Sequence, residues 1–232
     1  MSLNEITVEV TQQCPNRCIY CSSLSDMEKT ESLDYATILQ VVDDAVALDA
    51  KKVSLSGGEP FLRENIVEIV DYIFAKGVKV RFYSSGIYSD GVSHTSIPSK
   101  LLEAVKDKID ALIFNYEAVD AELYATIMGT EAANLALLDE TIHRAITLGI
   151  PVEAHLVPMH CNYRQIPDVL SKLYSMGVSN VSFLRIVPQG RVLENKELVE
   201  KSVEEQEELK KDNGKVSRNL SGQNSAWPAI FC

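Results

Sequence analysis

Apolar residues recur along this chain with two periods, which alternate from one segment to the next. Six β-branched or apolar stretches with a period of two are predicted to be strands. They cover residues 6–11, 52–56, 78–84, 111–116, 151–157 and 180–187. Stretches with a helical period follow them, at residues 33–48, 66–75, 98–105, 135–148, 167–176 and 202–211.

Residues at the ends of these stretches support the predicted helix boundaries. Ser32 is expected to cap the first helix, and Pro98 to stand near the first position of the third. Gly77, Gly149 and Gly177 close three of the other helices, because glycine readily takes the left-handed conformation that ends a helix.

Six strand–helix units with short connections predict a parallel sheet with helices outside it. Val53 and Leu55 oppose Ser54 and Ser56, so this strand keeps one polar face. A strand between two helix layers is apolar on both faces, whereas a wet or ligand-filled lumen accepts polar residues. The prediction is therefore an α/β fold, a partial (β/α)6 barrel of TIM-like form. The fingerprint G-x-G-x-x-G is also missing after the first strand, which argues against a Rossmann sheet.

Composition narrows the class of protein. The 232-residue chain is 46% hydrophobic with a formal net charge of −11, which suits a globular protein and argues against binding to nucleic acid or an anionic membrane. Neither a signal peptide nor a membrane-spanning apolar run is visible. Five cysteines are an odd number for a disulfide framework. We therefore expect a protein of the reducing cytoplasm.

Distinctive residues follow the predicted strands, at the end where barrels of this kind carry their chemistry. They are Cys14, Cys18 and Cys21, then Gly57-Gly58-Glu59-Pro60, Ser84-Ser85-Gly86, Asn115, residues 158–161, and Arg185 with the segment VPQGR. We expect them to surround one site.

The cysteine run C-x3-C-x2-C is the strongest chemical signal. Cys14, Cys18 and Cys21 are one thiolate short of a tetrahedral metal site, but three thiolates can bind three irons of a cubane and leave the fourth open. Zinc is the alternative, yet structural zinc usually takes two C-x2-C pairs. Only Cys161 and Cys232, each alone, are available to complete such a site.

The Gly-Gly turn after the second strand is ambiguous by itself. Gly57 and Gly58 belong to an ordinary strand–helix turn, or to a loop whose backbone approaches a ligand closely.

Both motifs together resemble the radical S-adenosylmethionine (SAM) superfamily. That family carries C-x3-C-x-aromatic-C after its first strand, matched here by the cysteines and Tyr20, and GGEP after its second strand, matched at residues 57–60. The resemblance covers roughly residues 5–190 and implies that Cys14, Cys18 and Cys21 hold a [4Fe–4S] cluster. SAM would chelate the fourth iron through its amino and carboxylate groups.

The resemblance also implies contacts to SAM. The backbone of Gly57, Gly58 and Pro60 together with Glu59 would bind the methionine ammonium, and Tyr20 would lie near the adenine. Further expected contacts come from Ser84 and Ser85, to ribose or carboxylate, and from Asn115, where many relatives have serine. Met128 stands where the family often has arginine, and Arg185 binds an anionic group of SAM or substrate, or pairs with a lumen carboxylate.

The implied activity is reductive cleavage of SAM to a 5′-deoxyadenosyl radical, which abstracts hydrogen from a substrate. The electron would come from a donor such as flavodoxin or ferredoxin. A peptide or protein substrate is favoured, with a small-molecule or cofactor-biosynthesis role as the alternative. A non-catalytic iron–sulfur or zinc protein is the rival from another class, but such a protein has no use for GGEP.

Glu153 and His155 share one face of the fifth predicted strand. They form a structural pair lining a wet interior, or they bind substrate or shuttle a proton; the first interpretation is favoured. Cys161 receives no role.

The C-terminal part predicts a second unit. Residues 1–195 form the expected barrel domain, and residues 196–232 an acidic helix and tail. The segment up to Cys232 resembles radical SAM proteins of the SPASM type, in which a cysteine near this point opens a domain with auxiliary clusters. One cysteine cannot hold a cluster alone, so the expectation is a truncated or split form, or a protein without that function.

Overall fold

One curved parallel sheet dominates the computed structural model, which describes residues 3–209 and 211. Its strands run in the order β1-β2-β3-β6-β7-β8. They are β1 (Glu5–Thr11), β2 (Lys52–Gly57), β3 (Lys79–Ser84), β6 (Ile109–Asn115), β7 (Val152–Leu156) and β8 (Asn180–Phe183). All neighbours in this sheet pair in parallel. β1 and β8 do not pair with each other, so the barrel is open, and the predicted α/β partial barrel is confirmed.

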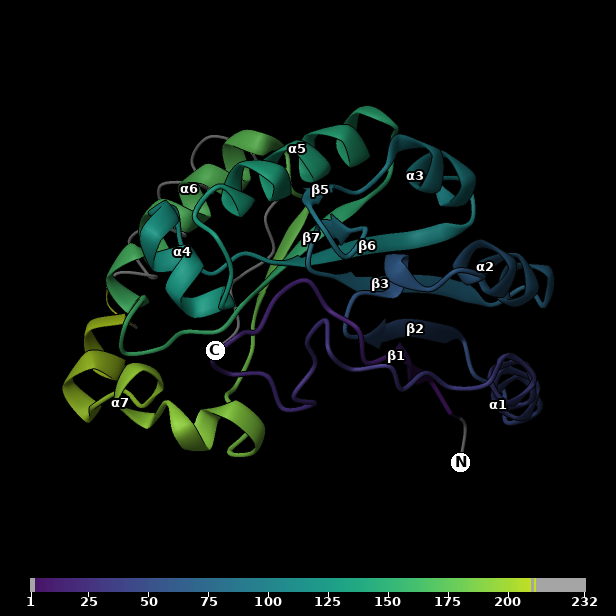
Figure 1. The fold of residues 1–232 in the computed structure, drawn as a ribbon, viewed down its shortest axis with the longest axis horizontal. Coiled ribbons are helices and arrows are strands. Elements are labelled where there is room, and N and C mark those ends of the chain that lie inside the picture. Colours follow the sequence, from purple (N-terminus) through teal and green to yellow (C-terminus); the bar gives the residue numbers. More distant parts are fainter. Residues whose placement is uncertain (1–2, 210, 212–232) are drawn as a thin grey trace.

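Helices cover the outer side of the sheet. The helices of the described residues are α1 (Tyr35–Ala47), α2 (Ile66–Ala75), α3 (Ser99–Val105), α4 (Ala121–Met128), α5 (Asn134–Thr147), α6 (Ile166–Met176) and the short α7 (Lys196–Val199), with a further helical segment at residues 203–209. Figure 1 shows α1, α2, α3, α5 and α6 outside the arc of strands. Ile69 and Ile73 of α2 and Val53 and Leu55 of β2 are completely buried in the core between these layers. Burial of such side chains is the main source of stability in a fold of this kind.

The inner face of the sheet is polar, as the period of the strands predicts. Thr7 and Glu9 of β1, Ser56 of β2, Tyr83 of β3 and His155 of β7 all line one cavity inside the arc. Their neighbours in sequence point outward into the helix layer. The lumen is therefore a place for ligand rather than a second apolar core.

The predicted start of the first helix is wrong by two residues, whereas Pro98 stands near the first position of the third predicted helix, as expected. The N-cap of α1 is Asp34, whose carboxylate accepts a hydrogen bond from the Thr37 amide at 2.9 Å. The Ser32 hydroxyl instead donates a hydrogen bond to the Thr11 hydroxyl at 3.2 Å. The side chain that accepts from the first turn of α1 therefore lies two residues after Ser32. Pro98 is the N-cap residue of α3 and stands just before its first turn.

Several short elements were not predicted. They are α4, α7, the antiparallel hairpin of β4 (Ile87–Ser89) and β5 (His94–Ser96), and the 3-10 turns η1 (Pro60–Leu62), η2 (Tyr163–Gln165) and η3 (Gly190–Glu194). Each has eight residues or fewer, which is too short for a clear hydrophobic period.

The sixth predicted strand is too long. β8 ends at Phe183 because its partner β7 ends at Leu156, whose carbonyl oxygen accepts from the Leu184 amide at 2.9 Å. Arg185 therefore lies in an irregular, exposed segment beyond the sheet. Residues 203–209 are helical, as predicted, whereas Cys232 lies outside the described residues. No helix among the described residues is long and apolar enough to span a membrane.

Candidate active site

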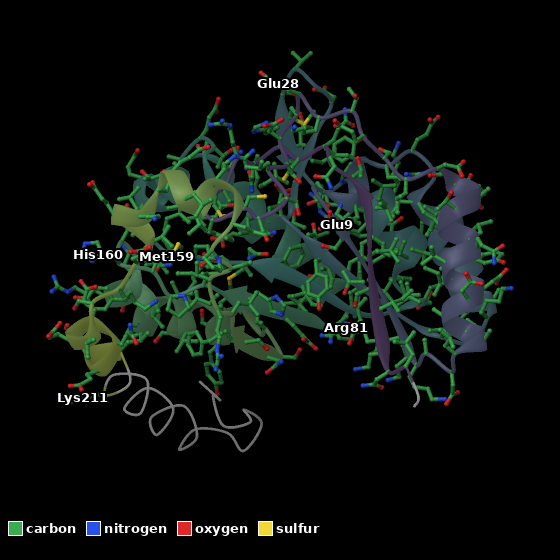
Figure 2. All side chains as sticks on the ribbon, turned by 90° about the horizontal axis from the view of Figure 1, so that it is seen from below. Glu9, Glu28, Arg81, Met159, His160 and Lys211 are labelled. Atoms are coloured by element: carbon green, nitrogen blue, oxygen red, sulfur yellow. The ribbon has the colours of Figure 1, made fainter. Side chains whose placement is uncertain are left out.

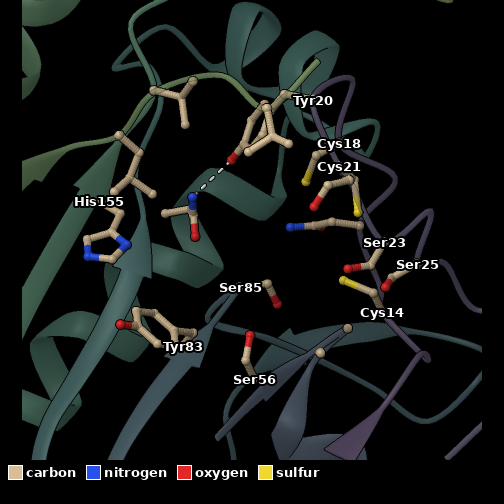
Figure 3. A pocket seen from close by; sticks show the side chains of 18 of the residues that line it. Cys14, Cys18, Tyr20, Cys21, Ser23, Ser25, Ser56, Tyr83, Ser85 and His155 are labelled. Carbon is tan, nitrogen blue, oxygen red and sulfur yellow. Dashed lines mark hydrogen bonds between the residues drawn. The ribbon is translucent and has the colours of Figure 1, made fainter. Parts of the chain in front are cut away.

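A cavity of about 470 Å³ lies inside the arc, at the C-terminal ends of the strands. Figure 3 shows Cys14, Cys18 and Cys21 along one wall and His155 and Tyr83 on the opposite wall. Of the residues predicted from the sequence, those lining the cavity are Cys14, Cys18, Tyr20, Cys21, Gly57, Gly58, Ser84, Ser85, Asn115 and Arg185. Glu59 and Pro60 are buried and do not line it.

The cysteines belong to a loop that crosses the mouth of the barrel. Figure 2 shows Glu28, in this loop, beyond the C-terminal end of β1, with Glu9 below it and Arg81 lower still. We call residues 12–31, between β1 and the start of α1, the cysteine loop. It contains no helix or strand, so its shape depends on what it packs against.

The Gly-Gly turn holds the start of the cysteine loop. The Gly58 amide donates to the Thr11 carbonyl and the Glu59 amide to the Gln13 carbonyl, both at 2.7 Å. A Cβ at Gly58 would stand 2.0 Å from the Gln13 oxygen, a distance that no packing allows. Glycine is therefore required because two backbones meet here.

The C-terminal end of α4 holds the middle of the loop. The Arg17 amide donates to the Met128 carbonyl and the Ile19 amide to the Ile127 carbonyl, both at 2.9 Å. The Met128 sulfur lies 3.8 Å from the Cys18 sulfur. Met128 lines the cavity, and thus a thioether occupies the place where the family often has arginine.

The far end of the loop rests on η3. The Arg191 amide donates to the Cys21 carbonyl at 3.1 Å. Its side chain is buried and donates to the carbonyls of Leu24 and Ser25 at 2.9 and 2.7 Å, and it pairs with the Asp26 carboxylate at 3.1 Å. Sequence reasoning singled out this segment but not Arg191 as the residue that contacts the cysteine loop.

All three thiols are free, and so is Cys161. Burial raises the pKa of Cys14 and Cys18 well above the ordinary range, and the positive charge of Arg191 is among the influences that lower it. Thiols in such an environment become thiolates when a metal replaces the proton. Within the described ranges, no three Cys, His, Asp or Glu side chains are gathered as ligands of one ion. A cubane does not need that arrangement, since each thiolate binds a different iron.

Glu59 supports the cavity from behind. Its carboxylate accepts hydrogen bonds from the Ser84 hydroxyl at 2.9 and 3.0 Å, from the Ser85 amide and hydroxyl at 2.6 Å, and from the Phe61 amide at 3.1 Å. Burial raises its pKa to about 7, although these donors work in the other direction. Glu59 thus links η1 to the end of β3, where Ser84 and Ser85 face the cavity.

A second buried carboxylate, Glu117, was not predicted. It accepts from the Tyr20 hydroxyl at 2.8 Å and from the Val157 amide at 2.9 Å, and Asn115 donates to Tyr20 at 3.1 Å. Burial raises the pKa of Glu117 to about 7. It lies two residues beyond Asn115, on a loop rather than on the strand, so the strand period gave no sign of it.

The opposite wall carries aromatic side chains. The rings of His155 and Tyr83 pack with centroids 5.3 Å apart. Burial, followed by the charge of Arg81, lowers the pKa of His155 to about 4, so its imidazole is neutral near pH 7. Glu153 is ion-paired with Arg81 and does not line the cavity. The two residues therefore do not act together: Glu153 is structural, and His155 faces the ligand space.

Asn16, between the first two cysteines, is a buried polar residue at the cavity. It is 2% exposed, and neither polar atom of its side chain makes a hydrogen bond of good geometry, although the side chain interacts with the Tyr124 hydroxyl and acts to lower its pKa. Weakly satisfied groups of this kind are rare in folded proteins and require an explanation. Because Asn16 lines the cavity, a bound ligand would supply a better partner.

The chain is similar in sequence to known proteins. The family model described as the radical SAM superfamily matches residues 8–173. A PqqA peptide cyclase of Methylobacterium nodulans is 28% identical over 177 residues, which are 76% of this chain and 45% of that protein. A probable GTP 3',8-cyclase of Methanococcus maripaludis is 24% identical over 191 residues, 81% of this chain and 61% of that protein.

Solved structures share the fold. Streptococcus suis SuiB, in a crystal structure bound to the precursor peptide SuiA, has a TM-score of 0.78 at 15% identity, covering 100% of this chain and 49% of that one. The enzyme anSMEcpe with bound AdoMet has a TM-score of 0.67 at 14% identity, covering 99% of this chain and 64% of that one. The chain thus spans about half the length of the first curated relatives it matches.

Proposed function

Because the chain belongs to the radical SAM superfamily, whose members use a [4Fe–4S] cluster and SAM, we propose that it catalyses reductive cleavage of SAM and hydrogen abstraction from a peptide. One observation carries the proposal. A single cavity at the C-terminal ends of the strands is lined by three free thiols, a Gly-Gly turn and two adjacent serines. These three groups come from separate parts of the chain.

The residues present fit the cluster and SAM. Cys14, Cys18 and Cys21 would hold the cluster, since they are reduced and share one wall. Bound there, the cluster and SAM would supply one-electron cleavage and a 5′-deoxyadenosyl radical. Asn16 lines the same space and offers a donor and an acceptor that make no hydrogen bond of good geometry, as a polar ligand requires.

We assign the remaining contacts by position. The backbone of Gly57 and Gly58, which lines the cavity, would receive the methionine part of SAM. The Ser84 and Ser85 hydroxyls would contact the ribose or carboxylate. Glu59 would act only through these serines, because they and the Phe61 amide occupy its carboxylate. Pro60 would fix the turn.

The adenosyl and substrate contacts follow the other walls. Tyr20 and Asn115, joined by a hydrogen bond of 3.1 Å, would hold the adenosyl part. Arg185, exposed at the mouth of the cavity, would meet an anionic group of SAM or substrate. Neutral His155 would orient the substrate by hydrogen bonding.

Relatives support a peptide substrate. The curated relative is named a PqqA peptide cyclase, and SuiB has been crystallised with its precursor peptide. The second candidate is a small-molecule substrate, which the GTP 3',8-cyclase relative favours. We further propose a one-electron donor such as flavodoxin or ferredoxin, a reducing cytoplasm as the location, and residues 1–195 as the barrel domain.

Anaerobic reconstitution tests the chemistry. The protein is incubated with iron and sulfide, reduced with dithionite in the presence of SAM, and assayed for 5′-deoxyadenosine. The wild type is expected to form it, C18A to lose both iron and product, and C161A, whose half-buried thiol lies outside the cavity, to retain both. A wild type that binds zinc, or a cluster without cleaving SAM, would contradict the proposal.

The substrate requires a separate experiment. The reduced enzyme is incubated with SAM and one of two candidate substrates, a small peptide encoded beside this gene or GTP. Mass spectrometry then measures any change in the mass of each candidate. A change in the mass of the peptide, dependent on Cys18, supports peptide modification. Conversion of GTP alone would favour the small-molecule role.

A further inference from the structure

Arg191 of η3 is a buried cation that contacts the cysteine loop. Its side chain is 4% exposed. One guanidinium nitrogen, Nη2, donates to the carbonyls of Leu24 and Ser25 and pairs with the Asp26 carboxylate. Hydrogen bonds from a charged donor are stronger than those between neutral groups, so these three contacts hold the end of the loop in one place.

The backbone around Arg191 meets the same loop at its last cysteine. The Arg191 amide donates to the Cys21 carbonyl at 3.1 Å, and a Cβ at Gly190 would lie 2.3 Å from that oxygen. Asp26 in turn accepts from the Cys14 amide through its carbonyl at 3.1 Å. Arg191 therefore acts on both ends of the run that contains the three thiols.

The charge of Arg191 is only partly balanced. Asp26 is its one carboxylate partner among the described ion pairs, and Asp26 is shared with Arg17, whose Nε lies 3.9 Å away. The second guanidinium nitrogen, Nη1, is buried without a partner. Positive charge thus remains beside the loop in a region that water does not screen.

We propose that Arg191 is a positioning residue for the iron–sulfur cluster: it fixes the cysteine loop, and its charge favours the reduced cluster. This inference rests on the cluster proposed above. Reduction adds one electron from the donor, and with it one negative charge, to the cluster and its three thiolates. A nearby cation stabilises the more negative form and raises the reduction potential.

Two variants separate anchoring from charge. R191M removes both the fork of donors and the charge, whereas R191K keeps the charge and loses the fork. R164M is the matched control, because Arg164 is exposed on η2 and its guanidinium packs on the Tyr163 ring, away from the cysteine loop. Circular dichroism first establishes that each variant is folded.

The first measurement uses the protein without iron. Hydrogen–deuterium exchange is followed in peptides covering residues 12–31. Faster exchange there is expected in R191M and R191K, with R164M equal to wild type. Unchanged exchange in both Arg191 variants would overturn the anchoring role.

The second measurement uses the reconstituted protein without SAM. Iron content is determined, and the midpoint potential is obtained from a redox titration followed by EPR. The potential of R191M is expected to move to more negative values, while R191K and R164M stay with the wild type. If R191M does not fold, an R191K potential equal to wild type, combined with faster loop exchange, supports the proposal, and a changed potential contradicts it.

The two hypotheses fail in different ways. A wild type that takes up no iron overturns the proposed function and this role with it. If the wild type assembles the cluster and R191M equals it in loop exchange and in midpoint potential, only the role of Arg191 is overturned.

Discussion

The carboxylate of Glu59 accepts hydrogen bonds from both the backbone amide and the hydroxyl of Ser85, each at 2.6 Å. This contact explains how a residue of the GGEP motif shapes the cavity without lining it. Glu59 is completely buried, and its oxygen atoms already have donors. We propose that its effect on a ligand passes through Ser84 and Ser85.

Stability should fall with rising pH because of Glu59. Burial raises its pKa from 4.5 to about 7, so the folded protein holds a proton that the unfolded chain releases. This contribution is complete below pH 4.5 and is lost as the pH rises through about 7, a loss of about 3 kcal/mol. Urea unfolding at several pH values between about 5 and 8 measures it.

E59Q is the comparison for this prediction. Glutamine does not titrate, so any loss of stability caused by E59Q is the same at every pH. The free energy of unfolding of E59Q should therefore fall less steeply with pH than that of the wild type. His155, whose lowered pKa of about 4 acts in the opposite direction, and Glu117, with its raised pKa of about 7, are present in both proteins and cancel in the difference. Parallel curves for the two proteins would show that Glu59 does not titrate here.

Gly58→Ala should damage the site by steric overlap. The new Cβ would stand 2.0 Å from the Gln13 carbonyl oxygen, so two backbone segments must separate, and we expect a loss of about 3 kcal/mol or more. The control is Gly91→Ala, which has a positive φ of 88° but no neighbour within 4 Å. It should cost only about 1–2 kcal/mol. Equal losses in thermal unfolding would mean that the contact at Gly58 yields easily.

Local patterns were sufficient for the sheet and for many of the residues that line the cavity, although they did not single out Asn16, Ser23 or Ser25. The period of two placed Ser56 and His155 on the inner face, and the motifs at strand ends placed Cys14 and Ser84 around one space. These features are repeated along a regular strand or follow it directly, so they can be read without knowledge of tertiary contacts.

Residues that support the site from behind were not predictable in the same way. Glu117 matters because it meets Tyr20, 97 positions away, and Arg191 because it meets Ser25, 166 positions away. Their neighbours in sequence carry no period that distinguishes them from surface charges. The contacts of Glu59 were not predictable for a related reason, since only the fold shows that Ser84 and Ser85 donate to its carboxylate.

Tyr20→Phe should weaken the Glu117 network. The substitution removes the hydroxyl that donates to Glu117 at 2.8 Å and accepts from Asn115 at 3.1 Å. Buried groups that lose a partner cost about 1–3 kcal/mol, and the free energy of unfolding should fall by that amount. Tyr35→Phe, at a 37% exposed position, is the control and should change it by less than about 0.5 kcal/mol. An unaltered stability of Y20F would indicate that Glu117 is satisfied in another way.

Arg81→Met should raise the pKa of His155 in part while destabilising the fold. Arg81 is ion-paired with Glu153 inside the barrel, with side chains 16% and 22% exposed. Removing Arg81 leaves the Glu153 carboxylate without its partner cation, so we expect the free energy of unfolding to fall by about 3 kcal/mol. The charge of Arg81 also contributes, after burial, to the low pKa of His155, about 4. Without that charge the pKa should rise toward its ordinary value of 6.5, which NMR titration of the imidazole measures.

The matched control for this pair is Lys79→Met, which removes one partner of the Lys79–Asp110 pair at 3.0 Å on the surface. Exposed pairs contribute about 1 kcal/mol or less, so K79M should change neither the stability nor the His155 titration appreciably. The double variant R81M/E153L removes both charges and should recover most of the stability lost in R81M. Because E153L cannot restore the positive charge, His155 should keep its raised pKa in the double variant. A pKa of His155 that stays near 4 in R81M would show that burial alone keeps the imidazole neutral.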